Sequence, residues 1–381
     1  MAATRVDLRV LQVLRPAAGG MVRHVAALSS GLGERGIAVA VAAPISALMT
    51  AGPVRLAVDH DVPIGPAFHP IVDIRCSLML RRLSSGFDIV HAHGLRAALI
   101  AALAGSRSGT ARIATAHNMP ELHGTPARAA ARMAIRRADA IVAVSQAVAD
   151  QVVRLGADRH HIHVIPNGVA VGPLPDSSGR VSNRQSLGLP PDAFVIVGAG
   201  RLSPEKGFDV LISALPRVVA DVPIVLLVLV GDGPARIELD ARVFRSGLTP
   251  AVRLVGRVAD VEPWLRAADV VVVPSRSEGQ GLVALEAMAV GAPVVASRVG
   301  GLPEVVDDCI TGLLVPPEDP DALATAISRL AHDPVLRSRL GQAGYTRVCE
   351  RFAVGIMLDR VGSLYRANVK SLQGRGPLQA E

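Results

Sequence analysis

Two glutamates in the second half of the chain are spaced in a way that suits a hydroxyl-rich anion. The apolar run Val270–Val273 predicts a strand, and the loop after it carries Glu278. Gly279 and Gly281 follow, and a helical pattern then carries Glu286. N–H groups at a helix start favour an anion, and glycines let the backbone approach it closely. Carboxylates beside a phosphate site suit the hydroxyls of a ribose and a hexose, so the pattern indicates a nucleotide sugar.

Two cations follow an earlier strand-like run, Val195–Ala199. The segment G-A-G-R-L-S-P-E-K-G-F-D places Arg201 and Lys206 where a strand-end loop meets the next helix. Lys206 is one of only two lysines among 40 basic residues, which indicates that a compact ammonium is wanted there. Two cations in such a loop suit a diphosphate and would stabilise charge on a leaving group. The alternative is surface ion pairing with Glu205 or Asp209.

The first half of the chain contributes strand-end histidines. His93 and His117 each end a predicted strand, in D-I-V-H-A-H-G and A-T-A-H-N, and we expect both on the acceptor side of a site. A core or capping role is the alternative for either. His91 shares a strand face with His93 and is expected to be structural. Gly19-Gly20, between the first strand and the first helix, resembles a phosphate-binding turn, although a plain turn explains it equally well.

Other clusters carry weaker signals. Asp59-His60-Asp61 has the form of a metal-binding D-x-D, but we place it in a turn with no strand end to present it. Three histidines close together are expected to be surface residues beside a strand: His160, His161 and His163. Ser145 is expected to cap a helix. The sequence therefore predicts neither a metal site nor a cofactor.

Strand-like and helical runs alternate along the chain, which favours parallel sheets covered on both faces. The first half contains the strand-like runs Leu8–Leu14, Ala38–Ala43, Ile89–His91, Ile113–Thr115, Ala140–Val144 and His163–Ile165. After a stretch rich in Pro, Gly, Ser and Asp, the alternation restarts with Val195–Ala199, Ile224–Val230, Val252–Val255, Val270–Val273 and Val294–Ala296. Ligands of such sheets bind at the carboxyl ends of the strands. We therefore expect an α/β protein with two Rossmann-like halves.

The expected domain boundaries follow from this alternation. An N-terminal acceptor-binding domain spans residues 1–168, a linker spans 169–190, and a nucleotide-sugar-binding domain spans 191–354. A helix over 355–370 is expected to pack back on the first domain, because Met357, Val361, Leu364 and Tyr365 share one helical face. Residues 371–381 are expected to be a disordered tail.

Composition limits the function classes. The chain has 381 residues and a mean hydropathy of +0.38, yet its longest strongly apolar run, Val222–Val230, is only about half a membrane span. The N-terminus lacks a signal pattern, and three scattered cysteines fit a reducing cytoplasm. Aromatic residues make up 2% of the chain, which argues against stacking on nucleic-acid bases. We expect a cytoplasmic protein with no nucleic-acid partner.

The positive charge lies in the first half. Residues 1–170 hold 18 arginines and 10 acidic residues, whereas the rest of the chain has a net charge of −1. Arginines recur at helical spacing at Arg128, Arg132, Arg136 and Arg137. This pattern fits either a solvated helix face or contact with an anionic membrane or acidic acceptor.

Over nearly its whole length the sequence resembles the retaining GT-B glycosyltransferases of family 4. The similarity includes Gly19-Gly20, D-I-V-H-A-H-G, A-T-A-H-N, I-P-N-G-V, G-R-L-S-P-E-K-G, L-V-G-D-G-P and the segment with two glutamates eight positions apart. The resemblance implies two Rossmann-like domains whose parallel sheets face a central cleft. It also implies transfer of a hexose-type sugar from a nucleotide-diphosphate sugar to a hydroxyl acceptor, lipid-linked or soluble. The basic first half of the chain favours envelope polysaccharide or glycolipid synthesis.

Family roles transfer to matching positions. Arg201 and Lys206 would bind the donor diphosphate, Glu286 the ribose, and Glu278 the transferred sugar, with His117 near the reacting sugar. The expected catalytic residues are Arg201, Lys206, Glu278 and His117. The remaining donor contacts implied by the resemblance are Gly19, Gly20, Gly256, Val258, Gly281, Leu282 and Glu286. Gln280 departs from the family, which commonly has an aromatic residue there, so the resemblance does not determine the shape of the donor pocket.

The resemblance implies front-face transfer in which the leaving phosphate accepts the acceptor proton. Arg201 and Lys206 supply the charge that a metal would otherwise supply, so metal-independent activity is expected. A nucleotide-sugar epimerase of the same fold is the alternative from another enzyme class. Peripheral contact with the inner face of an anionic membrane is expected through the basic first half.

Overall fold

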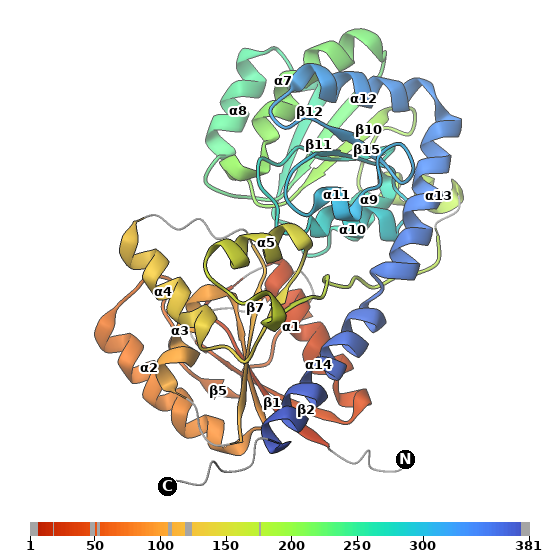
Figure 1. Cartoon of the computed structure of the whole chain (residues 1–381). Helices are drawn as coiled ribbons and strands as arrows, with labels where there is room; N and C mark the ends of the chain where they lie inside the picture. The colour runs from red at the N-terminus through yellow and green to blue at the C-terminus, as the bar shows by residue number, and fades with distance from the viewer. Residues whose placement is uncertain are drawn as a thin grey trace, which may run out of the picture. The chain divides into compact units, whose positions relative to one another are not determined.

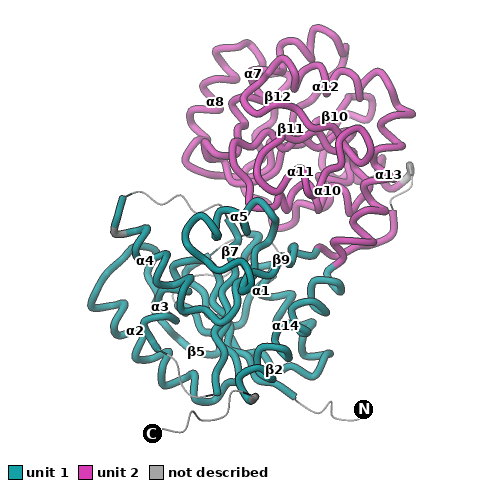
Figure 2. Tube along the Cα trace, viewed as in Figure 1, with its two compact units in different colours: residues 1–168, 354–381 teal, residues 169–353 magenta. Residues whose placement is uncertain are grey.

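The computed structural model describes residues 7–17, 19–45, 50–51, 54–105, 109–118, 124–174 and 177–374. The chain forms two compact units, shown in different colours in Figure 2. Unit 1 combines Met1–Gly168 with Val354–Glu381, and unit 2 is the continuous segment Val169–Ala353. Each unit is a parallel α/β sheet, as the alternation of apolar runs predicts.

Unit 1 is built on a parallel sheet that has seven strands within the described residues, in the order β5-β2-β1-β6-β7-β8-β9. The strands are β1 (Leu8–Val13), β2 (Ile37–Ala43), β5 (His60–Asp61), β6 (Ile89–His93), β7 (Ala111–Ala116), β8 (Ala140–Ala143) and β9 (Ile162–Val164). A short antiparallel pair, β3 (Thr50–Ala51) and β4 (Val54–Arg55), stands apart from it. The strand order reverses direction between β1 and β6, and ligands of such sheets bind at this point.

Helices cover both faces of this sheet (Figure 1). The connecting helices are α1 (Gly20–Gly31), α2 (Pro70–Leu83), α3 (Gly94–Ala104), α4 (Thr125–Arg136) and α5 (Gln146–Arg154). Leu11 and Val13 of β1 pack with α2 and α3, whereas Leu8 and Val10 pack with α1 and the C-terminal helix. Side chains alternate across a strand, so β1 contributes to a core on each face.

The C-terminal helix α14 (Val354–Gly374) belongs to unit 1 (Figure 2). Leu358 packs so tightly against α1 that a Cβ on Gly31 would lie 2.3 Å from it. The helix passes the expected end at residue 370, because Val369 is buried and Leu372 packs against the same core. Residues 371–374 are therefore helical rather than part of a tail, and the remainder of the expected tail, 375–381, lies outside the described residues.

Unit 2 is built on a parallel sheet with six strands in the described residues, in the order β12-β11-β10-β13-β14-β15. These strands are β10 (Phe194–Ala199), β11 (Val225–Val230), β12 (Val252–Gly256), β13 (Val270–Val273), β14 (Val294–Ser297) and β15 (Leu313–Val315). The order reverses between β10 and β13, which are paired in parallel. The loops after these two strands are therefore the expected ligand-binding loops.

The helices of unit 2 flank this sheet (Figure 1). They are α6 (Ser177–Ser186), α7 (Phe208–Asp221), α8 (Arg236–Arg245), α9 (Glu262–Ala267), α10 (Leu282–Ala289), α11 (Leu302–Val305), α12 (Pro320–His332) and α13 (Pro334–Arg351). Val195 and Val197 of β10 pack with α9 and α10, and Ile196 packs with α7 and α12. Every described residue of β10 is buried, as expected for a central strand covered on both faces.

The segment interpreted as a linker, 169–190, is an integral part of unit 2. Its helix α6 places Arg184 in a buried ion pair with Asp269, with 2.5 Å between Nη2 and Oδ2. The same guanidinium donates hydrogen bonds to the carbonyl oxygens of Ala267, Pro191 and Ala193. The polar composition of this segment led to its interpretation as a linker, because composition does not show that one arginine is buried and attaches the segment to unit 2.

Candidate active site

The charged residues of unit 2 gather at the reversal point of its sheet. Arg201 and the short 3-10 helix η4 (Pro204–Lys206) follow β10, and Glu278 lies in the loop after the neighbouring strand β13. Lys206 Nζ donates to Glu278 Oε1 at 2.6 Å, and Ser275 Oγ donates to the same oxygen at 2.9 Å. The side chains of Lys206 and Glu278 are 26% and 12% exposed, so the pair is sheltered but reachable.

Glycines allow these loops to approach each other. Gly207 ends η4 in the left-handed region, with φ 66°, and a Cβ there would lie 2.0 Å from the carbonyl oxygen of Pro274. Gly300, with φ 51°, would bring a Cβ within 1.9 Å of the carbonyl oxygen of Glu278. Only glycine can adopt a positive φ readily and also let a neighbouring carbonyl oxygen come this close to its Cα. The backbone therefore holds the loops of Lys206 and Glu278 together.

Lys206 does not pair with the neighbours that would make it an ordinary surface lysine. Among the described residues Glu205 accepts a hydrogen bond from Ser203 Oγ at 2.6 Å, and Asp209 accepts two from Arg276, each at 2.8 Å. The pKa of Asp209 is held below its ordinary value chiefly by these bonds from Arg276. Burial tends to raise the pKa of Glu205, but the Ser203 bond and the nearby cations outweigh it and lower the pKa. The local ion-pair alternative for Lys206 is therefore wrong.

Arg201 and Glu286 lie on either side of this pair in the chain. The Arg201 side chain is exposed and makes no hydrogen bond or ion pair within the described residues, so it is available to a ligand. Gly281 caps α10 with φ 94°, Leu282 is the first residue of that helix, and half-buried Glu286 lies one turn later. Gln280, in place of the family's aromatic residue, is 4% exposed and therefore part of the packed loop.

The end of β12 completes the unit 2 residues implied by the resemblance. Gly256 ends the strand with φ 85°, and its carbonyl oxygen accepts a hydrogen bond from the N–H of Gly231 at 2.8 Å. Val258 packs, half-buried, against the apolar core of the unit. The loops after β10 and β11 are also joined, because Leu202 donates its N–H to the carbonyl oxygen of Asp232 at 3.1 Å.

In unit 1 the structure brings His93 and His117 into contact. His93 is the last residue of β6, two residues beyond the expected strand end, and His117 directly follows β7. His93 Nδ1 lies 3.0 Å from His117 Nε2, and the rings stack with centroids 5.3 Å apart. Gly19 caps α1 with φ 66°, and Gly20 begins that helix, so this pair forms the strand-to-helix turn.

Three polar residues that the sequence analysis missed support the histidines. His93 Nε2 lies 2.6 Å from Gln12 Oε1, Gln12 Nε2 donates to the Tyr365 hydroxyl at 3.1 Å, and that hydroxyl lies 2.6 Å from His91 Nδ1. His91 Nε2 contacts Thr115 Oγ1 at 2.6 Å. Gln12, Thr115 and Tyr365 lie within apolar strand and helix segments. Their positions therefore predicted core packing and not hydrogen bonds to the histidines.

Burial keeps these imidazoles neutral. It is the largest cause that lowers the pKa of His91, to about 3, and the pKa of His24 on α1, to about 4. Burial first, and then the neighbouring imidazoles, hold the pKa values of His93 and His117 well below the ordinary value. Burial also raises the pKa of the Tyr365 hydroxyl. The cluster therefore carries hydrogen-bonding nitrogens rather than charge at neutral pH.

The weaker clusters have structural roles. Asp59 Oδ2 accepts the N–H of Val41, and Asp61 Oδ1 accepts the N–H of Ile45, so both carboxylates satisfy backbone at the end of β2. Asp61 lies in the short strand β5 rather than in a turn. His160 and His161 are exposed beside β9, as expected, whereas His163 lies within that strand and is half-buried. Ser145 caps α5 by accepting the N–H of Val148 at 3.2 Å.

No helix in the part of the chain that the structure describes has both the length and the apolar character needed to cross a membrane.

Family models match both halves of the chain. The model described as Glycosyltransferase Family 4 matches residues 18–172, and the model described as Glycosyl transferases group 1 matches residues 193–333. A D-inositol 3-phosphate glycosyltransferase of Saccharomonospora viridis is 32% identical over 94% of this chain and 91% of its own length. One of Xylanimonas cellulosilytica is 37% identical over 73% and 72%, respectively.

Solved structures show the same fold. HepE of Anabaena, in complex with UDP-glucose, has a TM-score of 0.81 and 23% identity over 95% of this chain and all of its own. A sucrose-phosphate synthase of Thermosynechococcus elongatus has a TM-score of 0.81 and 24% identity over 95% of this chain and all of its own. Both of the relatives described above are named as glycosyltransferases, and neither supports the epimerase alternative. Matched along both halves and by relatives of similar length, the chain belongs to glycosyltransferase family 4 and has the GT-B fold.

Proposed function

We propose that this glycosyltransferase is a metal-independent, retaining hexosyltransferase that uses a nucleotide-diphosphate sugar. The observation that carries the proposal is the convergence of Arg201, Lys206 and Glu278 on the two loops at the reversal point of the unit 2 sheet. Two cations and a carboxylate at such a point suit a diphosphate joined to a hydroxyl-rich sugar.

The residues of unit 2 divide the donor between them. Arg201 and Lys206 bind the diphosphate and stabilise the charge that develops as the bond to the sugar breaks. Glu286 on α10 accepts hydrogen bonds from the ribose hydroxyls, and Glu278 does so from the sugar. The backbone at Gly256 and Val258 contacts the base, while Gly281 and Leu282 place the start of α10 beside the phosphates.

The pair between Lys206 and Glu278 has a role in this scheme. Glu278 compensates the ammonium and holds it within the loop at 2.6 Å. A diphosphate offers Lys206 a stronger anionic partner, and Glu278 is then released towards the sugar hydroxyls. The two functions therefore depend on one exchange of partners.

We assign the acceptor side to unit 1, with His93 and His117 as its polar groups and Gly19-Gly20 as its phosphate-side turn. Because the pKa values of both histidines are held low, each presents a neutral imidazole that can accept or donate one hydrogen bond. The leaving phosphate accepts the acceptor proton, so no histidine is required as the base. The curated relatives are named for D-inositol 3-phosphate, and an acceptor bearing a phosphate would suit the positive charge of this half of the chain.

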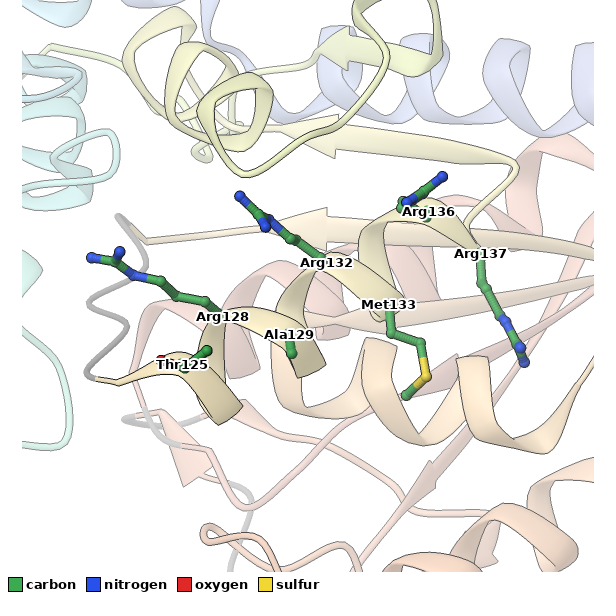
Figure 3. Close-up of a pocket in the computed structure, with 7 residues that line it drawn as sticks. All are labelled: Thr125, Arg128, Ala129, Arg132, Met133, Arg136 and Arg137. Carbon is green, nitrogen blue, oxygen red and sulfur yellow. The ribbon is translucent and has the colours of Figure 1, made fainter.

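The same positive charge supports peripheral contact with the inner, anionic face of a cytoplasmic membrane during envelope polysaccharide or glycolipid synthesis. Arginines one turn apart extend to one side of α4 and border a hollow of about 610 Å³ (Figure 3). These are Arg128, Arg132 and Arg136. Helix α3 packs against both α4 and α2, and α2 exposes an apolar stripe on the same helical layer. The stripe is Ile71, Ile74 and Leu78, which are 76%, 59% and 56% exposed.

Calorimetric titration with UDP alone tests the donor assignment. Glu286→Ala should weaken nucleotide binding, whereas Glu278→Ala should not weaken it but should reduce transfer from UDP-glucose. Glu238→Ala, an exposed glutamate on α8, is the matched control. Equal losses of UDP binding in both variants would show that the division of roles is wrong. Conversion of the nucleotide sugar without acceptor would instead favour an epimerase.

A further inference from the structure

Three histidines from separate elements of unit 1 meet in its interior. His24 lies on α1, His93 ends β6, and His117 follows β7. One ring nitrogen from each lies within 4.8 Å of the other two. The His24 ring centroid is 5.4 Å from that of His93 and 4.8 Å from that of His117.

His24 is the unexplained member of this cluster. Its side chain is only 7% exposed, and neither ring nitrogen has a hydrogen-bond partner of acceptable geometry among the described residues. Asn167 lies close enough to raise the pKa of His24 slightly against the effect of burial, but outside that geometry. A buried polar ring without a partner destabilises the fold, and a bound group would satisfy its nitrogens.

The hydrogen bonds of His93 orient its ring for a ligand. The Gln12 Oε1 atom at 2.6 Å is a carbonyl oxygen and can only accept, so His93 Nε2 carries the proton. His93 Nδ1 therefore has a free lone pair that faces His117 Nε2 at 3.0 Å. Metal-binding histidines typically donate their other N–H to a carbonyl or carboxylate oxygen in this way.

The spacing matches a metal ion of zinc type. Ring nitrogens bind zinc at about 2.0–2.1 Å, which places two ligands of a tetrahedron roughly 3.3 Å apart. The His93–His117 separation of 3.0 Å is already close to this value. The His24 ring would have to move by on the order of 1 Å to reach the same spacing from both other rings. Neutral imidazole is the form that binds such ions.

We propose that His24, His93 and His117 form a binding site for one divalent transition-metal ion of zinc type, with Gln12 as the outer partner of His93. Imidazole ligands without carboxylates favour zinc, copper and nickel over magnesium and calcium. Binding requires the His117 proton to move from Nε2 to Nδ1, so that Nε2 can face the ion. No proton leaves the protein in that exchange of tautomers.

The consequence for transfer rests on the proposed function. If His117 contacts the reacting sugar, an ion on its ring occupies the nitrogen that the sugar needs. The ion is then an inhibitor rather than a requirement, and removing it with a chelator leaves transfer intact.

Metal binding is measured on the untagged full-length chain after chelator treatment, by competition with a chromophoric zinc indicator and by the visible spectrum of added Co²⁺. We expect one ion per chain and a tetrahedral Co²⁺ spectrum. Gln12→Leu should weaken binding about 10–100-fold, as outer-partner changes do, and His24→Ala by at least about 100-fold. His332→Ala, an exposed histidine of unit 2, is the matched control and should bind normally.

Two readouts keep the result interpretable. Circular dichroism shows whether His24→Ala is folded, and His117→Ala gives a second ligand deletion at a half-buried position. Absence of stoichiometric binding to the unsubstituted chain, or metal affinity in both deletion variants equal to that of the unsubstituted chain, would overturn the proposal. Stoichiometric binding without inhibition of transfer would support the metal site and count against the assigned role of His117.

Discussion

The contact between Lys206 and Glu278 makes a prediction that separates a structural pair from a functional one. Lys206→Met keeps the side-chain stem and removes the charge, which leaves Ser275 as the hydrogen-bond partner of Glu278 Oε1. Glu278→Gln removes the opposite charge. The double variant removes both. We expect each single variant to destabilise unit 2 and the double variant to recover most of the loss, because no uncompensated charge remains.

The magnitude follows from the geometry. A hydrogen bond to a charged group contributes about 1.5–3 kcal/mol to stability. Lys206 retains 26% of its side-chain exposure, so water competes for its charge and the lower end applies, about 1–2 kcal/mol. With a urea dependence of about 2 kcal/mol per molar, each single variant should lower the unfolding midpoint by roughly 0.5–1 M.

Tryptophan fluorescence reports on the relevant unit. The chain has one tryptophan, Trp264 on α9, which is 9% exposed in the core of unit 2. Urea unfolding followed at this residue therefore measures the unit that carries the pair, without a signal from tryptophan in unit 1. Initial rates of transfer are measured on the same preparations.

Stability and turnover should separate in the double variant. Its unfolding midpoint should return towards the original value, while its turnover stays about 10²–10³-fold below it, because the leaving diphosphate has lost Lys206. Single-variant losses that simply add, within about 0.5 kcal/mol, would refute the pair. Recovery of turnover together with stability would show that Lys206 serves the fold and not the diphosphate.

Three further outcomes are expected. Gly281→Ala should destabilise unit 2 by about 2–4 kcal/mol, because the residue has φ 94° and its new Cβ would lie 2.4 Å from Leu302. Urea unfolding followed by Trp264 fluorescence measures the loss of stability, and a loss below about 0.5 kcal/mol would contradict the argument. Tyr365→Phe should lower the stability of unit 1 by about 1–3 kcal/mol, because the buried side chains of Gln12 and His91 lose the hydroxyl that they share. Hydrogen exchange of unit 1 amides measures this loss, and unchanged protection would contradict the prediction. The protein should sediment with vesicles of anionic lipid at low salt and not at roughly 0.5 M salt, and the double variant Arg128→Glu, Arg132→Glu should lose this binding. Equally strong binding to neutral vesicles would exclude the electrostatic contact.

The parallel sheets were predictable because their strands are fully buried and therefore continuously apolar. The run Val270–Val273 matches β13 at both ends, and its neighbours are correct to within one or two residues. The strand ending in His93 was placed two residues short, since polar side chains at its carboxyl end interrupt the apolar run. The same polarity makes that end a site, so the sequence pattern is least reliable where the chemistry lies.

The candidate site residues of unit 2 could be chosen from residue type and spacing, since Lys206, Glu278 and Glu286 stand out in loops and at a helix start. The contact between Lys206 and Glu278 could not be predicted in this way. Pairing between Lys206 and Glu278 depends on two loops 72 positions apart that meet only because β10 and β13 are neighbours. In unit 1 the partners Gln12 and Tyr365 lie 353 positions apart, and no local pattern connects them.

The return of α14 to unit 1 has a consequence for biosynthesis. During translation the first 168 residues leave the ribosome before unit 2, but their apolar surface around Leu28 and Leu32 is covered only when Val361 and Tyr365 arrive from the end of the chain. Unit 2 is continuous and has all its contacts as soon as residue 353 is free. The half that is synthesised first therefore completes its fold last, and in the interval it is the part that most needs a chaperone and most readily enters misfolded pairings.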